Sequence, residues 1–199
     1  PSGVVLTTTN QNVSGIKTFT DTLQLNTTGT SQIIKLWNGN GNEPASTGMG
    51  INALNSITTG ANNTAMGIST LNILESGNAN TAFGAYAGTS VQASNTTALG
   101  AFSLTTNTAN GNCGIGFQAL KVNTTGGNNV AVGANSLKSC FTGSSNTAVG
   151  SNALSSSITN SSNTAVGSEA LQVNIGSTNT AVGASSLLNN TSGHTNTAL

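Results

Sequence analysis

The chain has 199 residues, only 4% of which are charged, and its four lysines balance its four acidic side chains without any arginine. A neutral chain without arginine lacks the positive surface that binds nucleic acids and anionic lipids, so neither is an expected partner. A membrane-spanning helix needs a run of about 20 apolar residues. The sequence contains no such run, so we expect no membrane insertion.

Residues 1–45 predict a small β-rich module that serves as a connector or a cap. Apolar and polar residues alternate from Val13 onward, and the segment QIIKLWNGNGN, which begins at Gln32, predicts a strand followed by a Gly/Asn turn. No copy of the repeat that fills the rest of the chain occurs here. The division therefore falls at residue 45, and residues 46–199 form a second region.

Residues 46–199 consist of nine copies of a short repeat and a truncated tenth. Two copies, SSNTAVGSNAL from Ser144 and SSNTAVGSEAL from Ser161, differ at one position. A period of about 17 residues is too short for two helices and fits one coil, or rung, of a parallel β-solenoid. The Asn, Gly, Ser and Thr in every copy also disfavour helix. All copies share a glycine, here the glycine column, which recurs at steps of 16 or 17: Gly50, Gly67, Gly84, Gly100, Gly116, Gly133, Gly150, Gly167 and Gly183.

Three further columns are apolar or small in every complete copy. The valine column lies one residue before the glycine, the alanine column two residues before it, and the leucine column four residues after it. Neighbouring strand residues point to opposite faces, so the valine and alanine columns need separate cover. We expect the valine and leucine columns to fill the core (Val132, Val149, Val166, Val182; Leu120, Leu137, Leu154, Leu171) and the alanine column to pack against another chain (Ala131, Ala148, Ala165, Ala181).

Stacking explains why the chain carries so little charge. Equivalent residues of successive rungs lie about 4.8 Å apart, so identical charges in one column would repel each other. Asparagine and threonine can instead form hydrogen-bonded ladders. One thin coil also buries little apolar surface per residue, which favours the association of several chains.

The motif SSNTAVGSNAL resembles the head repeats of trimeric autotransporter adhesins and similar repeats in tail fibres of phages and large viruses. This resemblance extends from Thr47 to Leu199. The stretch NQNVSGIKTF, Asn10 to Phe19, is similar to a segment common in tail-fibre proteins. The resemblance implies a left-handed β-roll wound into a homotrimer, a location on a virion or on a cell surface, and a surface receptor or glycan as partner. The adhesin repeat is shorter, so the dimensions of the roll are expected to differ.

The sequence thus predicts an all-β fold, a parallel β-solenoid packed or intertwined as a homotrimeric fibre, with the module 1–45 at its N-terminal end. The expected function is a structural segment of a viral or phage fibre that projects or forms an adhesive tip. A bacterial trimeric adhesin head is the alternative. Recurring threonines such as Thr147 and Thr164 leave an ice-binding solenoid as a remote third hypothesis.

No residue pattern predicts an enzyme, a cofactor or a metal site. Glu75 and Glu169 are separated by about 26 Å along a stacked rod, too far apart to cooperate in catalysis. The stretches GMGINA and GIGFQA match a dinucleotide fingerprint but are ordinary repeats in which glycine replaces alanine. Cys113 and Cys140 are expected to be free thiols, and His194 is expected to be a solvent-exposed turn residue without a second metal ligand nearby.

One pair of residues predicts a surface binding patch. Tyr86 and Phe102 lie two residues after the glycine on adjacent rungs, where other copies have Asn52, Asn135 or Asn152. Because that column is mostly polar, we expect both aromatic side chains to be exposed. Local packing between the two rings is the alternative interpretation.

Overall fold

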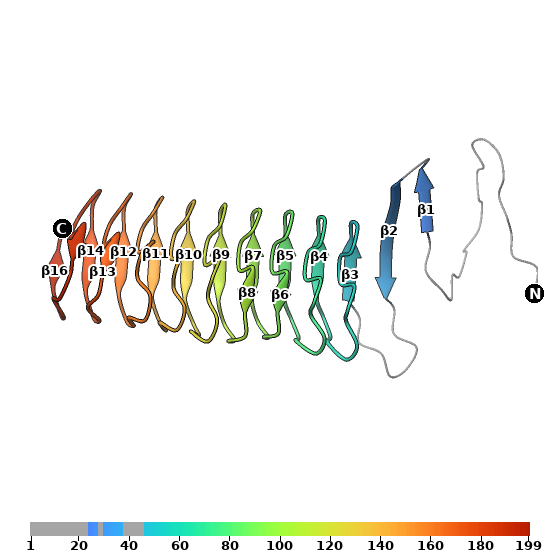
Figure 1. Cartoon of the computed structure of the whole chain (residues 1–199), viewed down its shortest axis with the longest axis horizontal. Helices are drawn as coiled ribbons and strands as arrows, with labels where there is room; N and C mark the ends of the chain where they lie inside the picture. The colour runs from blue at the N-terminus through green and yellow to red at the C-terminus, as the bar shows by residue number, and fades with distance from the viewer. Residues whose placement is uncertain (1–23, 28–29, 38–45) are drawn as a thin grey trace, which may run out of the picture.

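The computed structural model of the chain describes residues 24–27, 30–37 and 46–199, with side chains from residue 46 onward. Every regular element in these ranges is a β-strand, and none is a helix. The repeats stack as successive rungs of one rod, as Figure 1 shows. The predicted parallel β-solenoid is therefore confirmed, with one rung for each copy of the repeat.

One sheet runs the whole length of the rod, in the order β1-β2-β3-β4-β5-β7-β9-β10-β11-β12-β14-β16. From β3 onward its neighbours are parallel and their columns lie in register, for example Ala148 beside Ala165. The strands of the rungs in this sheet are β3 (Ser46–Met49), β4 (Thr64–Met66), β5 (Thr81–Phe83), β7 (Thr97–Leu99), β9 (Cys113–Ile115), β10 (Val130–Val132), β11 (Thr147–Val149), β12 (Thr164–Val166), β14 (Thr180–Val182) and β16 (Thr197–Ala198).

Two antiparallel strands precede the first rung. Strand β1 (Gln24–Thr27) pairs with β2 (Thr30–Trp37), and β2 pairs with β3 in a register that places Ile34 opposite Met49. Strand β2 thus occupies the backbone edge that the first rung would otherwise leave open. The strand predicted near Gln32 is confirmed, whereas the alternating segment from Val13 to residue 23 lies outside the described residues.

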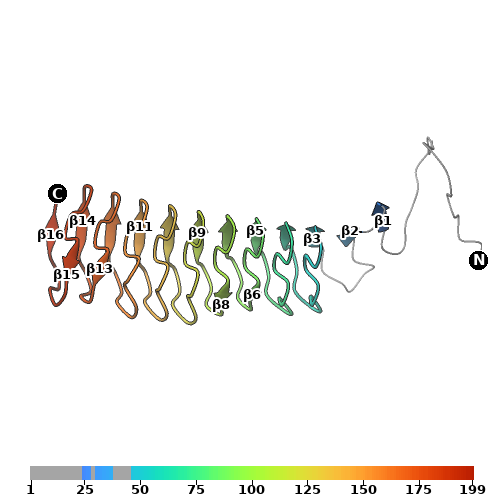
Figure 2. The same ribbon diagram turned by 45° about the horizontal axis from the view of Figure 1, so that its top comes forward.

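The return side of the coil carries two short parallel ladders, visible in Figure 2. They pair β6 (Ser90–Val91) with β8 (Thr106–Asn107), and β13 (Val173–Asn174) with β15 (Asn189–Asn190). Each ladder begins in one of the shorter rungs. Between two of the longer rungs, which have one residue more, the return turn widens instead, and the Glu75 carbonyl accepts three successive backbone N–H groups. The extra residue is absorbed in this turn, so the main sheet keeps its register.

The core of the coil is built from the leucine and alanine columns. Leu120, Leu137, Leu154 and Leu171 are completely buried, which confirms the predicted leucine core. Ala131, Ala148, Ala165 and Ala181 are also completely buried within the single chain. The prediction that the alanine column packs against another chain is therefore wrong.

The valine column lies on the outside of the coil. Val149 and Val166 are each 37% exposed and Val182 is 39% exposed, while Val132 is half-buried, so the prediction that these valines fill the core is also wrong. The reason is the narrow interior. A methyl group added to Gly48, in the alanine column, would lie 3.3 Å from Leu54 Cδ1, which leaves room for nothing larger than alanine.

The leucines reach the core from an unusual backbone conformation. Every leucine of the column has a positive φ, between 46° and 51°. The left-handed conformation costs an L-residue about 1–2 kcal/mol, whereas complete burial of a leucine stabilises by about 1.5–3 kcal/mol. Burial therefore outweighs the backbone strain, and the one exception in the column, Gly88, adopts a similar φ at no steric cost.

Candidate functional site

Three aromatic side chains from consecutive rungs form a cluster on the surface, here called the aromatic cluster: Tyr86, Phe102 and Phe117. The rings of Tyr86 and Phe102 stack with their centroids 5.2 Å apart and their planes 4° from parallel. Phe117 meets Phe102 edge-on, at 6.2 Å and 89°. Tyr86 is exposed, as predicted, but Phe102 is half-buried, so the prediction that both rings are exposed is wrong for Phe102. The stacking agrees with the alternative of local packing between the two rings. Binding of a ligand there stays a prediction.

The turn that follows the glycine column positions two of these rings. Tyr86 and Phe102 both have a φ of 58°, and all other residues of their column are left-handed too. Asparagine tolerates this region best after glycine, whereas a bulky side chain is rarely found there. Asn135 and Asn152 form the same turn in other rungs, so the fold does not require an aromatic residue at this position.

Sequence reasoning missed Phe117 because it stands one residue after its glycine, not two. It is 49% exposed, and the turn carries its ring toward Phe102 of the preceding rung. The clustering of aromatic residues in one part of the sequence could have indicated it. Of the five aromatic residues between 46 and 199, four fall between positions 83 and 117.

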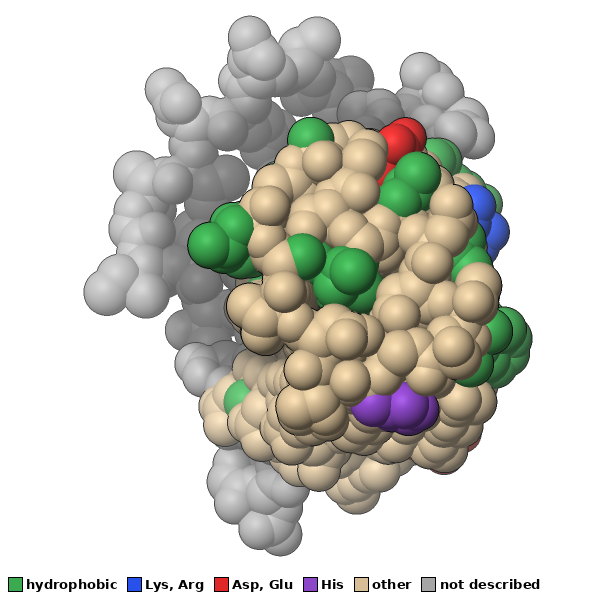
Figure 3. Space-filling model, turned by 90° about the vertical axis from the view of Figure 1, so that its left-hand side faces the viewer, with side chains coloured by type: hydrophobic (Ala, Val, Ile, Leu, Met, Phe, Trp, Pro, Cys, Tyr) green, Lys and Arg blue, Asp and Glu red, His purple; other side chains and the backbone are tan. Residues whose placement is uncertain are grey.

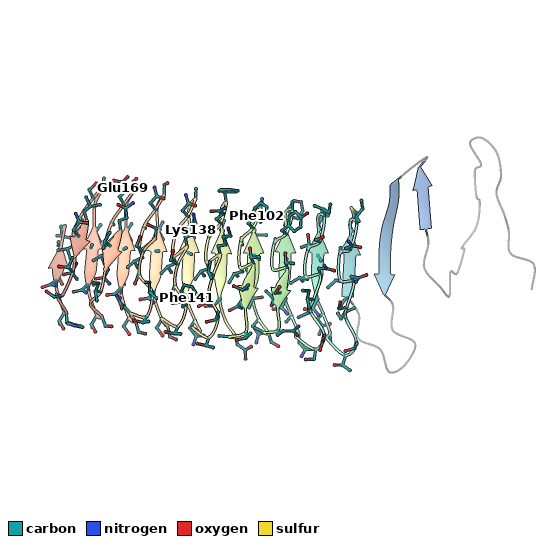
Figure 4. All side chains as sticks on the ribbon, in the orientation of Figure 1. Phe102, Lys138, Phe141 and Glu169 are labelled. Atoms are coloured by element: carbon teal, nitrogen blue, oxygen red, sulfur yellow. The ribbon has the colours of Figure 1, made fainter. Side chains whose placement is uncertain are left out.

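One lysine side chain lies next to the aromatic cluster, and a second lies one rung away from it. The ammonium of Lys121 is 6.0 Å from the centroid of the Phe102 ring, within the range of a cation–π contact. Lys138 occupies the same column one rung further on. Figure 4 places Phe102, Lys138 and Glu169 nearer one long edge of the rod and Phe141 nearer the other.

These two lysines are not neutralised by nearby acidic side chains of residues 46–199. Glu75 and Glu169 are the acidic side chains in that range. Glu169 lies two rungs beyond Lys138, about 10 Å along the rod, and it accepts a hydrogen bond from Ser185 Oγ. The aromatic cluster therefore borders a local positive charge on an otherwise neutral surface. Figure 3, which looks along the rod, shows few acidic or basic side chains on the end that it presents.

The outward face of the main sheet is the second notable surface. It is formed by the valine column and by the threonine column two residues before it, and we call it the outer strand face. Its exposed apolar members include Met49 (42%), Phe83 (53%) and Val149 (37%), and neither column contains a charged residue. A separate apolar group, Phe141, Ile158 and Ile175, lies in the return turn of three successive rungs.

The two cysteines are free and differ in their surroundings. Cys113 replaces threonine on the outer strand face and is half-buried, and burial raises the pKa of its thiol. Cys140 is completely buried in the core, where burial raises the pKa of its thiol to about 11. Neither thiol has the electropositive surroundings of a reactive cysteine.

The other candidate residues and motifs from the sequence analysis form no site in the described residues. GMGINA and GIGFQA begin in strands β3 and β9, and neither precedes a helix. The exposed His194 accepts the backbone N–H of Ser177 at Nδ1, at 3.0 Å. Among residues 24–27, 30–37 and 46–199 no three His, Cys, Asp or Glu side chains gather as metal ligands. The same residues include no helix long and apolar enough to cross a bilayer.

No family model, curated protein or solved structure matches this chain. Two surfaces of the rod are candidates for contact with other molecules. These are the outer strand face, with its row of exposed apolar side chains, and the aromatic cluster with its lysines.

Proposed function

We propose that this chain is a structural fibre segment that assembles as a homotrimer on the surface of a virus or a cell. The rod holds a recognition surface away from the body that carries it. A viral or phage fibre is the first assignment, because NQNVSGIKTF resembles a tail-fibre segment. A bacterial trimeric adhesin head is the alternative within the same class. The stoichiometry of three comes from the resemblance of the repeats to trimeric heads.

The observation that supports association is the outer strand face. Each rung presents an apolar side chain outward at the same position, from Met49 to Val182, although the chain has ample Asn, Ser and Thr with which to cover it. A continuous apolar stripe without charge is typical of a protein interface. Burying it would add apolar contacts that the thin coil does not provide for itself.

The partner that fits this stripe is a second copy of the same chain. Along the sequence, residues of the valine column are 16 or 17 positions apart, in an irregular order. In space they are evenly stacked, because the parallel strands pair in register. Another copy, aligned in parallel, has the same stack at the same heights. Equal heights allow the apolar side chains of all copies to meet rung by rung.

Light scattering of the purified chain tests this assembly. We expect three times the chain mass of 19.5 kDa. Val149→Lys places a charge in the stripe and should give the monomer mass. Ile158→Lys is the matched control, since Ile158 is exposed in the return turn and should leave the trimer intact. A monomeric parent protein would overturn the proposal.

Crosslinking through Cys113 tests the register. In parallel copies joined through the outer strand face, the Cys113 thiols lie at one height and a short bis-maleimide should link two chains. The variant Cys140→Ser, which retains Cys113, should still crosslink. The variant Cys113→Thr, which restores the usual residue of the column, should not. Crosslinking that persists in Cys113→Thr would contradict the arrangement.

A second candidate function is an ice-binding solenoid. The specific observation in its favour is that the threonine and valine columns both face outward on a regular parallel sheet, as with Thr164 and Val166. Assembly through the outer strand face would bury the same surface, so the two roles exclude each other. Thermal hysteresis in a solution of the monomer favours ice binding, and a trimer without hysteresis favours the fibre.

A further inference from the structure

We propose that the aromatic cluster, together with Lys121 and Lys138, binds an acidic saccharide, that is, a glycan that carries a carboxylate. This inference deepens the proposed function and rests on it, since recognition of a surface glycan is what a projecting fibre would do.

Comparison of equivalent positions in different rungs shows which side chains the fold requires. At the position of Phe102 other rungs use Asn135 or Asn152, and at the position of Lys121 they use Thr105 or Ser155. All these rungs form the same turn with the same left-handed backbone. The departures from the small or polar pattern gather on consecutive rungs, in one patch. The rings pack against one another, but the turn does not require that packing, and we therefore assign them a contact with another molecule.

The chemistry of the patch indicates the ligand. Tyr86 is 39% exposed and Phe117 is 49% exposed, and their rings offer an apolar platform for the C–H face of a pyranose ring. The ammonium groups of Lys121 and Lys138 offer point charges for a carboxylate. Sugar rings that bear a carboxylate combine both features. A nucleic acid does not fit, because the chain is neutral overall and has no arginine.

The shape of the site predicts weak binding by each copy. The cluster lies on the open surface of the rod, where a ligand keeps much of its solvent contact. We expect a Kd of about 1 mM for one site. Three copies at one height would raise the apparent affinity for a multivalent surface.

Titration followed by NMR tests the site directly. Tyr86 is the one tyrosine of the chain, so its ring signals report on the cluster without ambiguity. The probes are a hyaluronan tetrasaccharide, which carries carboxylates, and its carboxyl-reduced form. We expect saturable shifts of the Tyr86 signals with the first probe and about tenfold weaker binding of the second. Absent shifts, or equal affinity for both probes, would overturn the proposal.

Substitutions by the residue that another rung has at the same position test the aromatic rings and the lysines separately. Phe102→Asn should weaken binding of the tetrasaccharide about tenfold, and Lys121→Thr combined with Lys138→Ser should abolish the preference for the carboxylated probe. Phe141→Thr is the matched control, since Phe141 is exposed in the return turn and Thr124 occupies its column in the preceding rung. Unchanged binding by Phe102→Asn would contradict the site.

Light scattering of the same samples keeps this proposal distinct from the fibre assignment. Saturable, carboxylate-dependent shifts in a monomeric protein would support the saccharide site and contradict the homotrimer. A trimer without such shifts would support the fibre and contradict the saccharide site.

Discussion

The side-chain oxygen of Asn146 accepts the backbone N–H of Asn163, one rung further along the rod, at 3.0 Å. The Asn146 amide nitrogen donates to the Asn160 carbonyl at 2.8 Å and to the side-chain oxygen of Asn129 at 3.1 Å. Asn163 repeats this role toward the N–H of Asn179. Four residues before the glycine column, buried asparagines thus form a ladder that joins the strand of one rung to the return turn of the next.

Replacing Asn146 with alanine should be strongly destabilising. The change leaves the backbone N–H of Asn163, the Asn163 amide nitrogen and the Asn160 carbonyl without their partner. Asn129 Oδ1 still accepts the backbone N–H of residue 146. An unsatisfied buried polar group costs about 1–3 kcal/mol, so we expect a loss of at least about 2 kcal/mol in the free energy of unfolding. Urea denaturation measures it. Ser156→Ala, at an exposed position, is the control and should change stability by less than about 0.5 kcal/mol.

The glycine column should not tolerate substitution. Gly116 has a φ of 130°, and an added Cβ would lie 2.6 Å from the Gly133 carbonyl oxygen. Gly127 has no positive φ, and the nearest atom to an added Cβ would be 3.3 Å away. Gly116→Ala therefore suffers backbone strain of about 1–3 kcal/mol and a clash, whereas Gly127→Ala meets only a close contact.

Thermal denaturation of the two variants measures this difference. We expect the midpoint of Gly116→Ala to lie well below that of Gly127→Ala. Equal midpoints would mean that the close approach of neighbouring rungs does not restrict the glycine column.

Two neighbouring residues of β11 should respond differently to the same substitution. Ala148→Leu inserts three carbons into the narrow core and should cost about 1–3 kcal/mol of stability. Val149→Leu enlarges an outward side chain in a column that already contains Leu99, and should be nearly neutral for the fold. Denaturant unfolding of both variants checks the assignment of the two faces. A larger loss for Val149→Leu would reverse it.

The Cys140 thiol should make stability depend on pH in the alkaline range. Burial raises its pKa to about 11 from an ordinary value of 9.0. A raised pKa means that the folded chain holds the proton longer than the unfolded chain. The contribution is complete below about pH 9 and is lost as the pH rises toward about pH 11, and the loss reaches about 2 kcal/mol by about pH 10.5.

Comparison with Cys140→Val isolates this effect, because Val91 fills the same core column in another rung. The free energy of unfolding is measured for both chains at about pH 8 and about pH 10.5. We expect the parent to lose about 2 kcal/mol more than the variant between these conditions. Parallel losses in both chains would contradict the prediction.

Periodicity alone predicted most of the fold. The glycine column marks every rung, the leucine column marks the core, and the scarcity of charge follows from stacking identical positions about 4.8 Å apart. The pairing of Tyr86 with Phe102 also follows from their shared column. Phe117 and Lys121 stand in other columns, and only the path of the turn brings them to the Phe102 ring.

The sequence by itself determined the length of the rung, the columns and their register, because each copy restates the same local preferences. It did not determine which face of the strand is inside. The valine and alanine columns are both apolar, so hydrophobicity does not distinguish them, and strand alternation says only that they oppose each other. The tertiary structure decided which face is inside, because the interior of the coil is narrow. The gap between the strand and the left-handed leucines admits only a residue as small as Ala148, and Val149 therefore points outward.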